Sequence, residues 1–87
     1  MANTIYDRNS RNIGKIIESG GATCYYDGNS RLIGKAIKSG SWLCLYNASS
    51  RLIAKTDGNN TYDSNSRNIG RGNLFLKILY PDMAKII

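Results

Sequence analysis

Short apolar, β-branched runs alternate with clusters of Gly, Asn, Asp and Ser along most of the chain. The clusters recur about every eight to ten residues, which is too dense for helices of ordinary length. No apolar stripe with a helical period continues across a cluster. The runs between clusters are roughly five to seven residues long, a normal length for strands. The pattern therefore predicts an all-β protein built from hairpins.

One unit of this pattern occurs four times. Residues 6–15 (YDRNSRNIGK) are matched by 26–35 (YDGNSRLIGK), 46–55 (YNASSRLIAK) and 62–71 (YDSNSRNIGR). Each copy keeps Tyr, Ser, Arg, Ile and a final cation at the same places, and chance does not produce this. Within a copy, the Asp-x-Asn-Ser cluster is strong turn chemistry. We therefore predict four tandem β-hairpin repeats in a single domain, 1–87, at about 4–20, 21–40, 41–58 and 59–72, followed by an apolar segment at 73–87.

The residue after the repeat Ile is always very small: Gly14, Gly34, Ala54 and Gly70. Glycine inside a strand marks a bulge or the close approach of another backbone. Four such positions suggest that the strands converge there, in a pseudo-fourfold radial, flower-like arrangement. The repeat isoleucines would then form a core layer, with the repeat tyrosines packed around it and their hydroxyls at the rim. These residues are Ile13, Ile33, Ile53 and Ile69, and Tyr6, Tyr26, Tyr46 and Tyr62.

The repeated Tyr-Asp-x-Asn-Ser-Arg-x-Ile-Gly-Lys unit resembles those of the small bacterial four-fold beta-flower proteins, over residues 4 to about 72. It is also similar to the YD repeats of Rhs-type toxin shells, which occur in long arrays. Four copies in a short chain suit the flower better. The resemblance implies a fold, with no established activity and no catalytic residues. The turn differs, because this chain has Ser10, Ser30, Ser50 and Ser66 where that family often has Gly.

Charge adds a binding hypothesis. Twelve Lys and Arg against six Asp and Glu give a net charge of +6, which favours polyanions, nucleic acid first. The alternative is that this charge only keeps a small β protein soluble. Eight cations fall at two repeat positions, and pseudo-fourfold symmetry would make each set a ring. The candidate polyanion-binding residues are Arg11, Arg31, Arg51 and Arg67, and Lys15, Lys35, Lys55 and Arg71.

The arginine set has a second interpretation. Asp7, Asp27 and Asp63 each lie four residues before the Arg of their own unit, so each Arg can simply pair across its turn. Unit three argues against this as the whole explanation, because Asn47 replaces the Asp while the Arg stays. Both interpretations stay open for the arginines. The lysine set has no internal partner of this kind, which favours binding.

Catalytic chemistry is nearly absent from the sequence. The chain has no His and one Glu, so no acid–base pair, triad or metal-ligand spacing can be named. We expect no enzyme activity, no cofactor and no metal. Cys24 and Cys44 occupy the same repeat position and are expected to be small, half-buried strand residues. A disulfide between them requires Cα atoms within about 7 Å.

The end of the chain breaks the repeat. Residues 74–80 are the most apolar stretch, and Pro81 ends whatever precedes it. We favour a closing strand there, with a short helix as the alternative. Such a segment must pack on the sheet or on a partner chain, which makes a protein partner or a homodimer an expectation. The candidate interface residues are Trp42, Leu74, Phe75, Leu76, Ile78, Leu79 and Tyr80.

The sequence predicts a non-enzymatic binding module. Its first expected ligand is a polyanion such as nucleic acid. A lectin-like module using Tyr, Asn and Asp, or a protein–protein adaptor or assembly unit using the apolar end, are the alternatives. The chain begins without a basic, apolar leader and has no apolar run of 18 residues. The expected location is therefore the cytoplasm, without membrane insertion.

Overall fold

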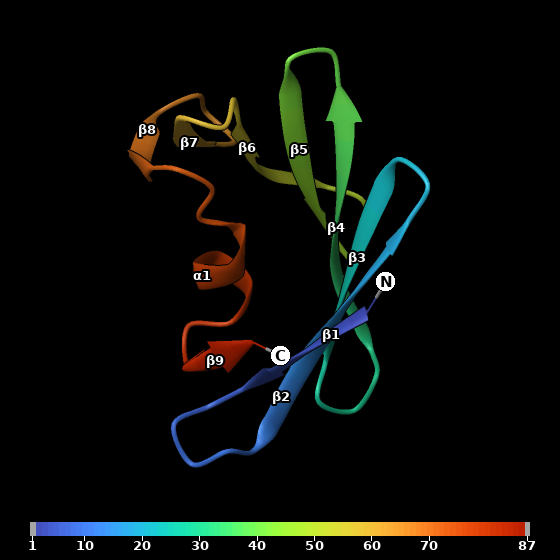
Figure 1. Cartoon of the computed structure of the whole chain (residues 1–87). Helices are drawn as coiled ribbons and strands as arrows, with labels where there is room; N and C mark the ends of the chain where they lie inside the picture. The colour runs from blue at the N-terminus through green and yellow to red at the C-terminus, as the bar shows by residue number, and fades with distance from the viewer. Residues whose placement is uncertain (1, 87) are drawn as a thin grey trace.

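The computed structural model describes residues 2–86 and forms one open antiparallel sheet that curls around a short C-terminal segment (Figure 1). Its elements, in chain order, are β1 (Ala2–Tyr6), β2 (Asn12–Ser19), β3 (Ala22–Asp27), β4 (Leu32–Ser39), β5 (Trp42–Asn47), β6 (Leu52–Thr56), β7 (Asn60–Asp63), β8 (Asn68–Arg71), α1 (Phe75–Leu79) and β9 (Lys85–Ile86). The predicted all-β class is confirmed.

The nine strands pair in the order β8-β7-β6-β5-β4-β3-β2-β1-β9. Every strand from β1 to β8 therefore lies beside its neighbours in the chain, and β9 returns to add a short strand beside β1. This sequential pairing joins the hairpins into one continuous sheet and does not confirm a radial, pseudo-fourfold arrangement. The favoured closing strand before Pro81 is wrong, because Phe75–Leu79 is helical.

Four hairpin tips share one turn geometry. In the first, the Asp7 amide donates to the Arg11 carbonyl oxygen and the Ser10 amide donates to the Asp7 carbonyl oxygen, and the other three tips repeat both bonds. Ser10, Ser30, Ser50 and Ser66 have φ of 62° to 67°. This is the three-residue loop that ends on a left-handed residue, a position that glycine fills without strain.

A register shift lies next to each tip, between Ile5 and Tyr6, Tyr25 and Tyr26, Leu45 and Tyr46, and Thr61 and Tyr62. Each such β-bulge bends its strand and increases the local right-handed twist. Four of them at equivalent places curl the sheet, and the sheet therefore has two unlike faces. We call the side that meets the C-terminal segment the inner face, and the opposite side the outer face.

The inner face carries the core. Alternate residues of the strands point to it, and the buried apolar set is Ile5, Ile16, Tyr25, Ala36, Leu45, Ala54, Phe75 and Tyr80. The last two come from the C-terminal segment, residues 74–80, which we call the tail. Helix α1 is too short to hold itself together in water, so its place depends on this packing. With five residues it is also far too short to cross a membrane, and no other described residues form a helix that does.

The small residues of the repeat make room for the tail. A Cβ atom added to Gly14 would collide with the Tyr80 ring, and one added to Gly34 or Gly70 would lie 3.3 Å from Leu79 or 2.5 Å from Leu74. A neighbouring strand is also close, since the added Cβ atoms of Gly14 and Gly34 would lie 2.6 Å and 3.1 Å from the carbonyl oxygens of Tyr26 and Tyr46. The sequence did not predict the contact with the tail. The tail side chains occupy the space that the missing side chains leave.

The core layer predicted from the repeat isoleucines is also wrong. Ile13, Ile33 and Ile53 are half-buried against the margin of the core, and Ile69 is 45% exposed. The repeat tyrosines do not surround the core either, since they lie on the outer face. Strand alternation explains both errors, because the deepest positions are those beside the repeat Tyr and Ile and not those residues themselves.

Candidate nucleic-acid interface

On the outer face every repeat tyrosine stands opposite a cation. The strand register pairs Lys15 with Tyr26, Lys35 with Tyr46 and Lys55 with Tyr62. At the edge, β9 pairs Lys85 with Tyr6 in the same way. Directly opposed residues have their side chains on one face, within contact distance. The outer face thus carries four tyrosine–cation pairs.

Three lysine side chains lie over aromatic rings. The Nζ atoms of Lys15 and Lys85 are 5.5 Å and 5.9 Å from the ring centres of Tyr26 and Tyr6. Lys55 is 4.8 Å from the Trp42 ring centre, and Trp42 in turn meets Tyr62 edge-on, with ring centres 5.5 Å apart. These contacts hold the lysines upright over partly exposed rings. Each contact is worth about 0.5–1 kcal/mol at an exposed site.

Charge on this face has one sign. Arg71 on β8 lies opposite Asn60 and points outward with the lysines, so the face holds five of the twelve cations: Lys15, Lys35, Lys55, Arg71 and Lys85. Among the described strand residues that point outward, none is acidic. The acids lie at turns, on the inner face or just after the tail: Asp7, Glu18, Asp27, Asp57, Asp63 and Asp82. The outer face therefore concentrates positive potential.

The arginine set lies elsewhere, at the hairpin tips. Because alternate turns of a meander fall at the same end of the sheet, Arg11, Arg31, Arg51 and Arg67 line one end. Arg11 Nε lies 3.2 Å from Asp7 and Arg31 Nε lies 4.0 Å from Asp27, while the two Arg side chains stay 74% and 80% exposed. Such exposed pairs contribute little to stability, because water and salt screen them. The structure does not place the two cation sets on one face.

The acidic residues of the tips mainly accept hydrogen bonds from backbone amides. Asp7 Oδ1 accepts from the Asn9 and Arg11 amides, and Asn47 Oδ1 accepts the same two bonds in unit three. Amide donation from Arg11 is the main cause that lowers the pKa of Asp7, and the guanidinium adds less. Asp and Asn are thus interchangeable as turn residues here. This resolves the exception in unit three, because the turn is held by backbone amides, and the Arg11 side chain adds a bond to Asp7 that unit three does without.

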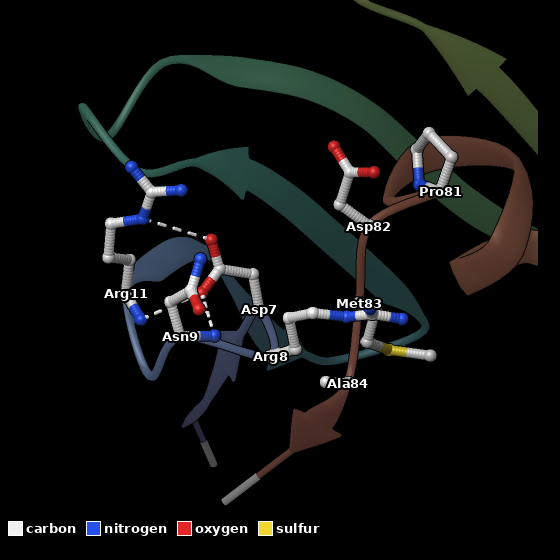
Figure 2. A pocket seen from close by; sticks show the side chains of 8 residues that line it. All are labelled: Asp7, Arg8, Asn9, Arg11, Pro81, Asp82, Met83 and Ala84. Atoms are coloured by element: carbon white, nitrogen blue, oxygen red, sulfur yellow. Dashed lines mark hydrogen bonds and ion pairs between the residues drawn. The ribbon is translucent and has the colours of Figure 1, made fainter.

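The first hairpin tip also lines a polar cavity of about 420 Å³ with the turn that follows the tail. Figure 2 shows Arg11 turned to Asp7, with the backbone of residues 81–84 running beside the tip. The Ala84 amide donates to the Tyr6 carbonyl oxygen and fixes this approach. Two arginines, Arg8 and Arg11, and two acids, Asp7 and Asp82, line the cavity, so its charge is balanced. The site therefore has less pull on a polyanion than the outer face.

The candidate interface residues are divided between the chain's own core and its surface. Phe75 and Tyr80 are buried in the core, where Tyr80 donates its hydroxyl to the Tyr26 carbonyl oxygen at 2.6 Å. Leu76 and Leu79 are half-buried against the same core, Leu74 is half-buried beside Gly70, and Ile78 is 38% exposed. Trp42 is half-buried and belongs to the outer face. Burial raises the pKa of Tyr80 to about 12.

The two cysteines are free. They lie on β3 and β5, with β4 between them. Two strand spacings are about 10 Å, which exceeds the span of a disulfide. Both side chains point to the outer face and are half-buried, as expected for small strand residues.

The pairing of tyrosines with cations was not predicted, although the sequence contains the signal for it. Lys15 and Tyr26 are equally distant from the Gly20–Gly21 turn, and the same holds for the lysines and tyrosines of the next two connections. A hairpin register centred on the turns between repeats would have found them. Lys85 gave no such signal, because its place depends on the pairing of β9 with β1.

The chain matches no known family model, no curated protein and no solved structure. The resemblance to the four-fold beta-flower proteins thus stays a prediction, and the site itself must supply any functional argument.

Proposed function

We propose that this protein is a non-enzymatic module that binds nucleic acid through the outer face of its sheet. The observation that supports the proposal is the segregation of charge: five cations point outward and no acidic strand residue accompanies them. Lysines on such a face neutralise phosphates and release counterions, which drives binding without sequence readout. The tip arginines extend the positive surface at one end of the sheet, where three acids accompany them.

The experiment compares two double variants with equal loss of charge. Lys15→Gln/Lys55→Gln removes two outer-face cations, and Lys38→Gln/Lys77→Gln removes one near a connecting turn and one from α1. Binding of a labelled oligonucleotide is followed by fluorescence anisotropy between about 50 and 200 mM salt. We expect the outer-face variant to lose about 1.4 to 1.8 from the slope of log K against log salt. The control variant should keep the wild-type slope.

Equal losses of slope in the two variants would mean that only net charge matters, and the outer face would then not be a specific binding site. Absence of any binding by the wild type at the low salt concentration would end the proposal. A lectin-like role is tested in parallel on a glycan array, where binding would be insensitive to salt. The turn oxygens Oδ1 of the repeat Asp and Asn are already engaged by backbone amides, which does not favour that alternative.

The proposal extends to organisation and location. The four hairpin repeats would act as equivalent binding steps, and the cytoplasm would be the place of action. A radial, flower-like arrangement of the repeats, and a homodimer through the exposed part of the tail, stay proposals of the same rank. Sedimentation at several protein concentrations and an experimental structure test them directly.

A further inference from the structure

We propose that the nucleic acid on the outer face is single-stranded, with bases stacked on the repeat tyrosines and phosphates held by the cation opposite each one. This inference rests on the proposed function and names its substrate class. The evidence is the pairing itself, since each of four steps couples one aromatic ring with one cation: Tyr6 with Lys85, Tyr26 with Lys15, Tyr46 with Lys35, and Tyr62 with Lys55.

A step of this composition matches the chemistry of one nucleotide. A base offers a flat π surface, and its phosphate offers one negative charge. Aromatic side chains stack on any base, while a basic surface follows the backbone. The rings are suited to this because all four repeat tyrosines and Trp42 are only half-buried. Tyr25, the inward neighbour of Tyr26, is buried and takes no part.

The steps form a diagonal series across the sheet. On β3, Tyr26 faces Lys15 and Cys24 faces Lys35, so the second lysine is displaced from the first by two residues as well as two strands. The same displacement separates Lys35 from Lys55 on β5. A flexible single strand can follow this path over a twisted surface. A duplex cannot, because it is stiff on this length scale.

The outer face also lacks a projecting helix or ribbon, the element that usually recognises a duplex. The major groove admits a helix or a two-stranded ribbon, whereas the tyrosine–cation pairs are spread over a sheet from β9 to β7. The nine strands all lie in this sheet and α1 lies on the inner face, so no described element projects from the outer face. Paired bases inside a duplex are hidden from the rings, and only an unpaired strand brings them into stacking contact.

The first test uses the unaltered protein with a single strand of about 20 nucleotides, the matching duplex, and heparin as a polyanion without bases. We expect the single strand to bind at least about tenfold more tightly than the duplex. It should also quench the fluorescence of Trp42, the only Trp, excited selectively. Heparin should bind with a comparable salt slope and leave Trp42 fluorescence unchanged.

The second test separates the ring from the hydroxyl. Tyr26→Leu/Tyr46→Leu removes two rings, and Tyr26→Phe/Tyr46→Phe keeps them. We expect the Leu variant to lose about tenfold per ring in affinity for the single strand, with an unchanged salt slope and unchanged heparin binding. The Phe variant should stay within about threefold of the wild type. A thermal unfolding curve for each variant checks that it is folded.

Three outcomes overturn the inference and leave the proposed function intact. These are equal or tighter binding of the duplex, the same weakening of heparin and single-strand binding in the Leu variant, and unquenched Trp42 on saturation with the single strand. If the Leu variant does not fold, the Phe variant and the Trp42 fluorescence still test whether bases stack on the rings. Failure to bind any of the three polyanions would instead remove the proposed function itself.

Discussion

The two faces of this sheet are made by the same repeat, yet one is packed against the tail and the other is left uncovered. On the inner face the repeat contributes its smallest residues, Gly14, Gly34, Ala54 and Gly70, and the tail fills the space beside them. On the outer face the same strands contribute their tyrosines and lysines, which no described element covers. Adjacent residues of one motif thus serve stability on one face and, under the proposed function, binding on the other. Alternation of side chains along a strand makes that division automatic.

The inner face should therefore be where the fold is most easily broken. Phe75 is fully buried in the core, and Ile78, on the same helix, is 38% exposed. Phe75→Ala is expected to lower the free energy of unfolding by about 3–5 kcal/mol, through lost burial and a cavity. Urea denaturation measures this. Ile78→Ala is the control and should cost less than about 1 kcal/mol, and similar losses in both variants would show that the tail is not anchored by Phe75.

The next largest effect is expected at the cradle for the tail, the small residues of the inner face that contact its side chains. Gly14→Ala puts a Cβ atom against the Tyr80 ring and the Tyr26 carbonyl oxygen. We expect a loss of about 1–3 kcal/mol in the free energy of unfolding, because the tail must shift. Gly21→Ala is the matched control, since nothing lies within 4 Å of its added Cβ atom. If Gly14→Ala proved as harmless as Gly21→Ala, the tail would not need the small residues of the repeat.

Alkaline pH should destabilise the packing of the inner face. Burial raises the pKa of Tyr80 from 10.0 to about 12, and the pKa of Tyr25 is raised in the same direction, also mainly by burial. The folded state therefore holds protons that the unfolded state has lost, and stability falls as pH rises from about 10 to 12. The decrease should reach about 2 kcal/mol. Tyr80→Phe removes the titrating hydroxyl.

Unfolding curves of the wild type and Tyr80→Phe across this pH range provide the measurement. The variant begins less stable, because the bond to the Tyr26 carbonyl oxygen is lost. Its stability should then depend less steeply on pH than that of the wild type. Parallel curves would mean that Tyr80 titrates normally in the folded protein.

The smallest effect is expected at the tips, which belong to neither face. Ser30 has φ of 67°, a conformation that costs an L-residue about 1–2 kcal/mol and glycine very little. Ser30→Gly should raise the free energy of unfolding by about 0.5–1 kcal/mol, after allowing for the greater freedom of glycine in the unfolded chain. Thermal unfolding tests this, and Ser39→Gly, at a position outside the left-handed region, should not stabilise. A gain at both positions would argue against relief of backbone strain.

The sequence by itself determined the strands, the turns and the division of residues between two faces. Turn residues such as Asp27 and Ser30 act within four or five residues of chain, and alternation is a property of any strand, so both are visible locally. The buried Tyr25 beside the half-buried Tyr26 follows from the same rule.

Only the tertiary structure decided which face became the core and what the small residues were for. The tail is apolar enough for either a strand or a helix, and its helical form depends on a cradle built from Gly14, Gly34 and Gly70, far from it in sequence. Once the tail covers one face, the other keeps its half-buried tyrosines and lysines side by side without such a cover. That choice depends on which face can accept a whole segment of side chains, and contacts between residues distant in the chain set this, not local pattern.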